Sequence, residues 1–207
     1  TTATTSESID AEVRANLSEN DSLYTLDCDA LAELKPDLII TQDLCHVCSI
    51  DLQSVQRVAA ALPHSPEILS LNPHTIEEVF DDLLRVGAAC GLDHDAQQAV
   101  VALRARWWSA RDHVNQLVSG PVTLLLEWMK PLFIAGHWTP ELIEQAGGRH
   151  VLNAPGAAST TIEPDALVEA APERLIIAPC GYDIPAIERE LTTLTDAPWW
   201  NDLPAVR

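Results

Sequence analysis

The chain has 207 residues, of which 47% are hydrophobic and 5% aromatic, so it can bury one sizeable core or two small ones. It contains 31 Asp plus Glu against 12 Lys plus Arg, a formal net charge of -19 at pH 7. Such a charge repels a phosphate backbone and argues against nucleic acid as a partner. No stretch approaches the roughly 20 apolar residues of a membrane-spanning helix, and no charged start precedes an apolar segment.

Residues 1–73 predict a partial N-terminal α/β lobe. Apolar residues at helical spacing predict helices over 9–17 and 50–62, the first ended by an Asn-Asp turn and the second by prolines. Strands are expected at the β-branched run that follows Pro36 and at 67–71. Two strands are too few for a stable lobe, so we expect the opening units of this lobe to lie outside the sequence.

Residues 74–119 predict connecting helices. The pattern is helical almost throughout, with one helix to about Cys90 and a long second one from Asp93 to Val118. The segment is much longer than a usual crossover and contains no flexible Gly/Ser linker. We therefore expect it to join two lobes rigidly.

Residues 120–207 predict a C-terminal α/β lobe. A buried strand is expected at 122–127 and a helix at 140–145, which a Gly-Gly pair ends. Further along, the pattern predicts a helix over 184–194 and the beginning of a strand at 203–207.

One phrase occurs twice in the chain. Residues 29–40 read DALAELKPDLII, and residues 165–177 read DALVEAAPERLII. In each copy a short helix stops before a proline, which disfavours helical geometry just ahead of it, and a strand follows. Each strand then ends in polar residues, at 41–48 and at 178–183. Because ligands of open α/β sheets bind beyond the carboxyl ends of strands, the two copies predict two related lobes with a ligand cleft between them.

Three segments together resemble the cobalamin-binding branch of the iron-siderophore and vitamin B12 substrate-binding proteins. They read TQDLCHVC over 41–48, EWMKP and IAGHW within 127–138, and APCGY over 178–182. The resemblance implies two Rossmann-like α/β lobes joined by a long α-helix, the class III periplasmic-binding-protein type, with the first lobe incomplete and the final strand absent. It also implies capture of a corrinoid such as cobalamin, or of a related metal chelate such as a ferric siderophore, between the lobes for ABC-type import.

The same resemblance implies a protein without a catalytic cofactor that docks on the permease of an ABC transporter. Aligning the repeat helix with the family places Asp165 at one docking position and Asp51 at the other; the alternative for both is ordinary solvated charge. We expect a monomer in the periplasm or another extracytoplasmic compartment. Five cysteines leave one unpaired, which favours free thiols and leaves a cytoplasmic location as the alternative.

A corrinoid has flat apolar faces and an amide rim, so its site needs aromatic surfaces and a few hydrogen-bonding groups. Trp128 and Tyr182 follow predicted strands, and His137 with Trp138 precedes a predicted helix. We expect all four to rim the cleft, the alternative for each being ordinary packing. The full predicted set of ligand-binding residues is Asp43, Leu44, Cys45, Trp128, His137, Trp138, Cys180 and Tyr182.

The segment Cys45-His46-Val47-Cys48 lies between a strand and a helix, the layout of thioredoxin-like redox sites. The repeat does not fit a thioredoxin domain, Ser49 stands where haem attachment needs His, and no second Cys or His pair completes a zinc knuckle. Three alternatives stay open: buried thiols that line the cleft, a disulfide between Cys45 and Cys48, and a soft-metal or cobalt site. Superposing the repeats puts Cys45 and Cys180 at nearly equivalent strand ends, so that site would use Cys45, Cys48 and Cys180, with His137.

Catalysis finds little support, because no Gly-x-Ser-x-Gly elbow, phosphate-binding glycine loop or His-Glu-x-x-His helix occurs. We therefore do not expect an enzyme. The functional alternative is a cytoplasmic thiol-dependent corrinoid or metal-handling protein that uses Cys45, Cys48 and Cys180, and a third class is a pure interaction module. We expect ordinary packing of Cys28, Cys90, Trp107-Trp108 and Trp199-Trp200, and solvent exposure of His64, His74, His94, His113 and His150.

Overall fold

The computed structural model describes residues 4–19, 23–44, 50–115 and 117–207. Contacts within the chain define two compact units. The C-terminal unit consists of Thr1–Asp10, His74–Glu77 and Val101–Arg207, and the N-terminal unit consists of Ala11–Pro73 and Glu78–Val100. The structure thus divides the predicted connecting helices between two units, and the domain boundaries expected from the sequence, at 73 and 119, remain a prediction.

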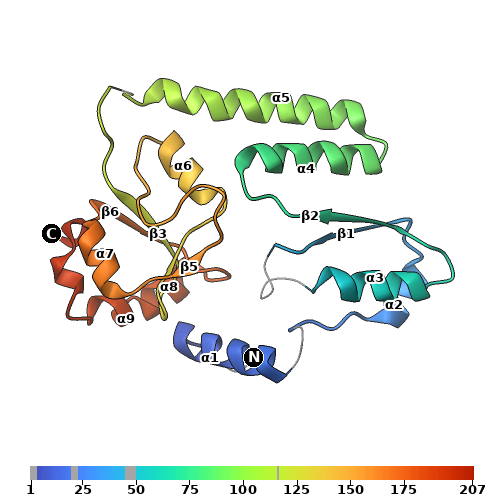
Figure 1. Cartoon of the computed structure of the whole chain (residues 1–207), viewed down its shortest axis with the longest axis horizontal. Helices are drawn as coiled ribbons and strands as arrows, with labels where there is room; N and C mark the ends of the chain where they lie inside the picture. The colour runs from blue at the N-terminus through green and yellow to red at the C-terminus, as the bar shows by residue number, and fades with distance from the viewer. Residues whose placement is uncertain (1–3, 20–22, 45–49, 116) are drawn as a thin grey trace. The chain divides into compact units, whose positions relative to one another are not determined.

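The N-terminal unit is built on a two-stranded parallel sheet. Strand β1 (Leu38–Gln42) pairs with β2 (Glu67–Leu71). In Figure 1, helix α3 (Leu52–Ala61) lies on one side of these strands and α4 (Ile76–Ala89) on the other. The apolar stripes of the two helices bury Val55, Ala59 and Phe80. The remaining helices that enter this unit are α1 (Ser6–Glu19), α2 (Cys28–Leu34) and α5 (Asp93–Ala110).

The repeated phrase produces the same backbone in both units. Helix α2 ends at Lys35 with φ 46° and ψ 55°, and α7 (Pro164–Ala170) ends at Ala171 with φ 45° and ψ 58°. Both residues precede a proline, whose ring disfavours the right-handed helical region in the residue before it. A strand follows each proline, and the predicted helix-to-strand unit is confirmed in both copies.

The C-terminal unit contains a four-stranded mixed sheet with the order β5-β4-β3-β6 (Figure 1). Its parallel pair is β3 (Thr123–Trp128) with β6 (Arg174–Ile177), whereas β4 (Phe133–Ile134) and β5 (Thr160–Thr161) are antiparallel additions. Apolar side chains pack on this sheet at 6% exposure or less. They are Leu124, Leu126, Met129, Leu132, Ile134, Leu167, Leu194 and Leu203.

The other helices of this unit are short. They are α6 (Thr139–Gln145), α7, α8 (Ile184–Glu190) and α9 (Thr192–Thr195), with 3-10 turns at Arg111–His113, Trp200–Asp202 and Pro204–Val206.

Three element predictions were wrong. The long helix predicted to Val118 stops at Ala110, because the next residues form a 3-10 turn and Val114 is extended. The helix predicted over 184–194 is interrupted at Leu191, between α8 and α9. The strand expected at 203–207 is a 3-10 turn, in which the Ala205 N–H donates to the Pro172 carbonyl. In each case local turn geometry overrode the apolar pattern.

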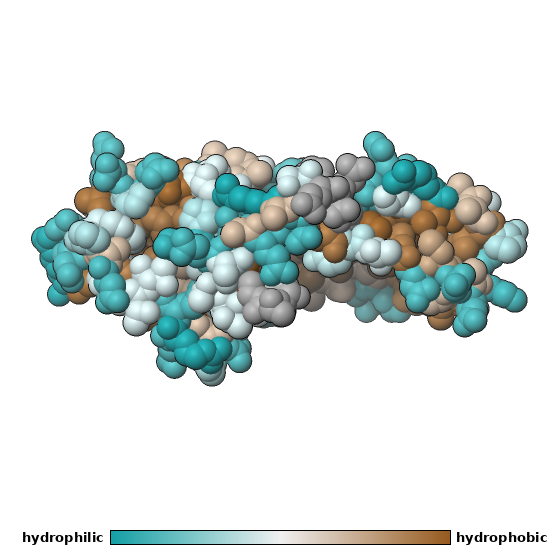
Figure 2. Space-filling view, turned by 90° about the horizontal axis from the view of Figure 1, so that it is seen from below, coloured by the Kyte–Doolittle hydropathy of each residue, from teal (hydrophilic) through white to brown (hydrophobic). Residues whose placement is uncertain are grey.

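Hydrophilic side chains dominate much of the face in Figure 2, with smaller hydrophobic patches between them. The exposed hydrophobic residues include Leu34, Trp108 and Ile184, at 75%, 54% and 71% exposure. Among the described residues, no helix has both the length and the apolar character that a membrane crossing needs.

Candidate functional site

Trp128 and Tyr182 lie together at the carboxyl ends of the two parallel strands of the C-terminal unit. Trp128 is the last residue of β3, and Tyr182 follows β6 in the turn before α8. Their rings meet edge to face, with centroids 5.5 Å apart and planes at 71°, an arrangement that aromatic quadrupoles favour. The structure therefore brings together two of the residues that the sequence predicts as ligand-binding.

The first turn of α1 packs beside this pair. The Trp128 indole Nε1 donates to the Ser6 carbonyl at 3.1 Å, and the Ser6 N–H donates to Oε1 of Glu190 at 2.5 Å. Ser6 and Glu190 are 1% and 8% exposed. A carboxylate at the start of a helix is favoured by the helix dipole, and Lys130 adds an ion pair to Glu7 at 2.8 Å. No pattern in the sequence indicates this arrangement, because the partners are more than 120 residues apart.

The Tyr182 hydroxyl and Oε2 of Glu190 are both buried, and the hydroxyl lies within hydrogen-bonding reach of the Glu190 carboxylate. Burial, and after it the charge of the Glu190 carboxylate, raises the pKa of Tyr182. The phenol therefore stays protonated at neutral pH. A protonated phenol can donate to the Glu190 carboxylate, which fixes the Tyr182 ring beside Trp128.

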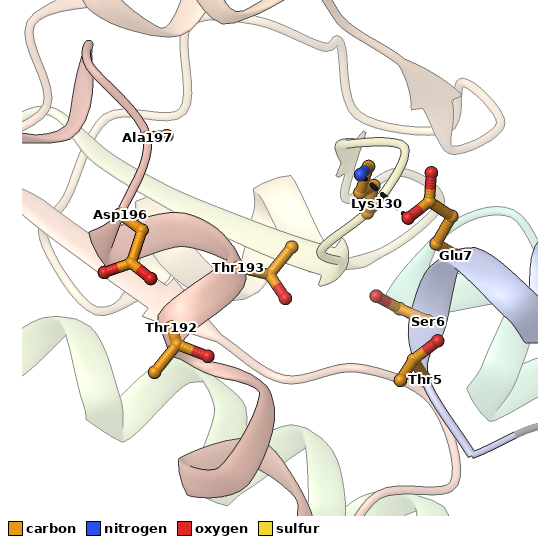
Figure 3. A pocket seen from close by; sticks show the side chains of 8 residues that line it. All are labelled: Thr5, Ser6, Glu7, Lys130, Thr192, Thr193, Asp196 and Ala197. Carbon is orange, nitrogen blue, oxygen red and sulfur yellow. Dashed lines mark ion pairs between the residues drawn. The ribbon is translucent and has the colours of Figure 1, made fainter.

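A polar hollow of about 380 Å³ shares Ser6 with this arrangement (Figure 3). The Glu7–Lys130 ion pair lies at its wall, and hydroxyl groups from α1 and α9 point toward it. Its volume lies within the range of small-molecule sites. Its lining residues are Thr5, Ser6, Glu7, Lys130, Thr192, Thr193, Asp196 and Ala197.

His137 and Trp138 lie elsewhere in the unit. They follow β4, which runs antiparallel to β3, with Leu126 opposite Ile134. The chain after β4 therefore leads away from the edge where β3 and β6 end. The His137 ring instead lies 5.6 Å from the His74 ring and 6.1 Å from the Trp138 ring.

The backbone holds His137 in an uncommon conformation, with φ 52°. Its N–H donates to the Ala157 carbonyl at 2.6 Å, and its carbonyl accepts from the Gly156 N–H at 2.9 Å. A Cβ at Gly136 would lie 2.4 Å from the Ala157 oxygen, so only glycine permits this close approach. The Asn153 side chain donates to the Ala158 carbonyl at 2.9 Å and orders the same loop.

The other predicted ligand-binding residues are spread over both units. Cys180 is exposed, with its N–H donating to the Glu127 carbonyl at 3.3 Å. Asp43 is exposed and follows β1, and Leu44 is half-buried. Cys45 and Cys48 lie outside the described residues, so their state stays open. Within the described ranges, no three His, Cys, Asp or Glu side chains are grouped so as to hold a metal ion.

The two predicted docking residues occupy helix starts. Asp51 is the N-cap of α3 and accepts from the Ser54 N–H at 2.8 Å. Hydrogen bonding to Ser54 lowers the pKa of Asp51, so this residue has a local structural role as well. Asp165 is exposed in the first turn of α7. The docking role of both Asp51 and Asp165 stays a prediction.

Four expectations of burial were wrong. His64, expected to be exposed, is half-buried, and its Nε2 lies 3.1 Å from the Pro36 carbonyl. Cys28 and Cys90 are exposed rather than in the core, because each lies at an end of a helix. His150 is buried, at 7% exposure, and its Nδ1 lies 3.2 Å from the Asn153 carbonyl. Desolvation by burial lowers the pKa of His150. By contrast, Trp199 and Trp200 pack against the core cluster, as predicted.

Comparison with known proteins agrees with this architecture. The model of the periplasmic binding protein family matches residues 1–207. The chain belongs to this family. Periplasmic binding proteins are binding components of transport and not enzymes, so the prediction that this protein is not an enzyme is confirmed. Membership in the family also implies an extracytoplasmic location. A search of curated protein sequences found no match.

Solved structures of periplasmic binding proteins share the fold. An ABC transporter substrate-binding protein from Listeria monocytogenes is 18% identical, with a TM-score of 0.71, and the match covers 87% of this chain and 67% of that one. The vitamin B12 binding protein BtuF of Vibrio cholerae is 18% identical, with a TM-score of 0.63 and coverage of 90% and 67%. A heme-binding protein from Pseudomonas aeruginosa is 19% identical, with a TM-score of 0.66 and coverage of 88% and 64%. The chain therefore has an α/β fold that resembles class III periplasmic binding proteins and spans about two thirds of these relatives.

Proposed function

We propose that this periplasmic binding protein captures a metal chelate with a broad flat face, that a corrinoid is its ligand, and that it delivers the ligand to the permease of an ABC importer. The observation that carries the proposal is the Trp128–Tyr182 pair at the carboxyl ends of β3 and β6. It presents aromatic surface, and a polar hollow adjoins it through Ser6.

The chemistry of a corrinoid matches these groups. Its apolar faces suit contact with the rings of Trp128 and Tyr182, and its amide rim suits the hydroxyl and charged groups that line the adjoining polar hollow. The fold relatives include proteins named for binding vitamin B12 and heme, which supports a flat chelate as the ligand class. Heme is the second candidate, because the aromatic surface alone suits its apolar faces equally well.

The remaining predicted residues belong to this proposal as further contacts. Asp43, Leu44, Cys45 and Cys180 would supply polar and thiol groups, and His137 with Trp138 would form a separate contact region. Asp51 and Asp165 would meet basic residues of the permease.

Thermal denaturation of the full-length protein with cyanocobalamin, cobinamide, heme or a ferric siderophore tests the proposal. A ligand at one hundred times its Kd stabilises the native state by about 2.7 kcal/mol, which corresponds to a rise in Tm of roughly 5–10 °C for a protein of this size. Stabilisation by corrinoids and not by heme supports the corrinoid. Stabilisation by heme alone replaces it with the second candidate, and no shift with any of the four refutes the proposal.

A pair of tryptophan variants locates the site. Trp128→Leu removes the aromatic surface at the end of β3 and should abolish most of the ligand-induced shift. Trp108→Leu is the matched control, because Trp108 is 54% exposed on α5 and does not belong to the predicted ligand-binding set. Equal loss in both variants would show that the aromatic pair does not bind the ligand.

A further inference from the structure

We propose that His74 and His137 form a binding site for a borderline divalent transition-metal ion such as Zn²⁺, Ni²⁺ or Co²⁺. The site goes beyond the proposed chelate-binding function, because its ligand is a free metal ion and not a chelate, and it lies with the loop after β4 apart from the Trp128–Tyr182 pair. Imidazole is a preferred ligand of all three ions.

The separation of the two rings fits shared coordination. With a metal–nitrogen bond of about 2.1 Å, the metal lies about 3.2 Å from the centre of each imidazole, so two rings at the tetrahedral angle have centroids about 5.2 Å apart. The observed centroid separation of His74 and His137 is 5.6 Å. The separation therefore permits one ion to bind both rings.

One nitrogen of the pair lacks a partner. The His137 Nε2 is buried and makes no hydrogen bond to any of the described residues. Buried polar atoms are nearly always satisfied, and an orphan nitrogen calls for a water molecule or an ion. A neutral imidazole nitrogen with a free lone pair is also the form that binds a metal.

The scaffold around the pair is preorganised. The positive φ of His137 is maintained by backbone hydrogen bonds on both sides of the residue, and such strain is typical of functional positions. On the other side, Oε2 of Glu141 accepts from the Ile76 N–H at 2.8 Å and so holds the segment that carries His74. Glu141 also adds negative charge near the pair, which favours a cation.

Two protein ligands leave the other coordination positions to water, so we expect moderate affinity and one ion per chain. Isothermal titration calorimetry of the full-length protein with Zn²⁺ alone should show one bound ion per chain. His137→Asn preserves the backbone, because Asn tolerates positive φ, and both His137→Asn and His74→Ala should weaken binding at least tenfold. His94→Ala and His113→Ala are matched controls at exposed histidines and should bind Zn²⁺ as the parent does.

Absorption spectra with Co²⁺ in place of Zn²⁺ distinguish binding to the histidines from binding to the cysteines, because thiolate ligands add intense near-ultraviolet absorption that imidazole ligands lack. Visible Co²⁺ bands without the thiolate absorption, lost in His137→Asn, are the expected result. Unchanged Zn²⁺ affinity in both histidine variants would overturn the site. It would also be overturned if the Co²⁺ spectrum were dominated by thiolate absorption and the double variant Cys45→Ser/Cys48→Ser no longer bound the ion. Chelate binding is measured separately without free metal ions, and Trp128→Leu, which leaves both histidines in place, tests it independently.

Discussion

The two copies of the repeat provide a stability test with a built-in control. Leu167 in α7 is completely buried in the core of the C-terminal unit, whereas Leu31, its counterpart in α2, is only half-buried. Truncating a fully buried leucine to alanine removes its transfer free energy and leaves a cavity, at a cost of about 3–4 kcal/mol. Truncating a half-buried leucine costs about 1–2 kcal/mol, because less apolar surface returns to water.

Tryptophan fluorescence makes this comparison specific to one unit. All six tryptophans of the chain lie at or after residue 107 and therefore in the C-terminal unit. With a urea m-value of about 2 kcal/mol/M, Leu167→Ala should lower the midpoint of the fluorescence transition by about 1.5–2 M. Leu31→Ala should leave that transition almost unchanged and shift only the transition followed by far-ultraviolet circular dichroism. Equal shifts of the fluorescence midpoint in both variants would refute the assignment of the two helices to separately packed units.

Three further predictions concern single contacts. Trp128→Phe retains an aromatic ring but removes the hydrogen bond to the Ser6 carbonyl, so it should lower the free energy of unfolding by about 1 kcal/mol in urea denaturation; an unchanged value would show that this bond is not made in solution. Burial lowers the pKa of His150 in the folded state, so the unfolded chain binds the proton more readily and stability should fall as the pH drops through the ordinary histidine pKa near 6.5. This part of the pH dependence of Tm should disappear in His150→Leu, and its persistence there would assign it to other groups. Gly136→Ala places a Cβ 2.4 Å from the Ala157 oxygen and should cost more than about 2 kcal/mol; a Tm within 1–2 °C of the parent, where 1 kcal/mol moves Tm by about 2–4 °C, would contradict the close packing of this loop.

Local sequence patterns were sufficient for the regular elements. The strand at Glu67–Leu71 was predicted without error, because a short apolar run between a proline pair and an Asn-Pro turn leaves one interpretation. The repeat was equally clear, since a proline after a short apolar helix ends that helix, and a strand follows in both copies. Errors fell at helix ends such as Ala110, where the apolar pattern continues although the hydrogen bonding changes.

The site shows the same division between local and distant information. The positions of Trp128 and Tyr182 after parallel strands follow from the sequence, because the ends of such strands share one edge of the sheet. The sequence also groups His137 with them, but β4 runs antiparallel to β3 and carries His137 away from that edge. The sequence could not predict this, because the direction of a two-residue strand cannot be inferred from periodicity.

The sequence by itself therefore determined the α/β class, the repeated helix-to-strand units and the aromatic residues at the strand ends, because each depends on neighbouring residues in the chain. Only the tertiary structure decided that Ser6 and Glu190 meet beside Trp128, that His74 lies next to His137 and that His150 is buried. The two contacts join residues that are far apart in sequence, and the burial of His150 depends on residues that are distant in the chain. Such information resides in the packing of the whole unit and not in any local pattern.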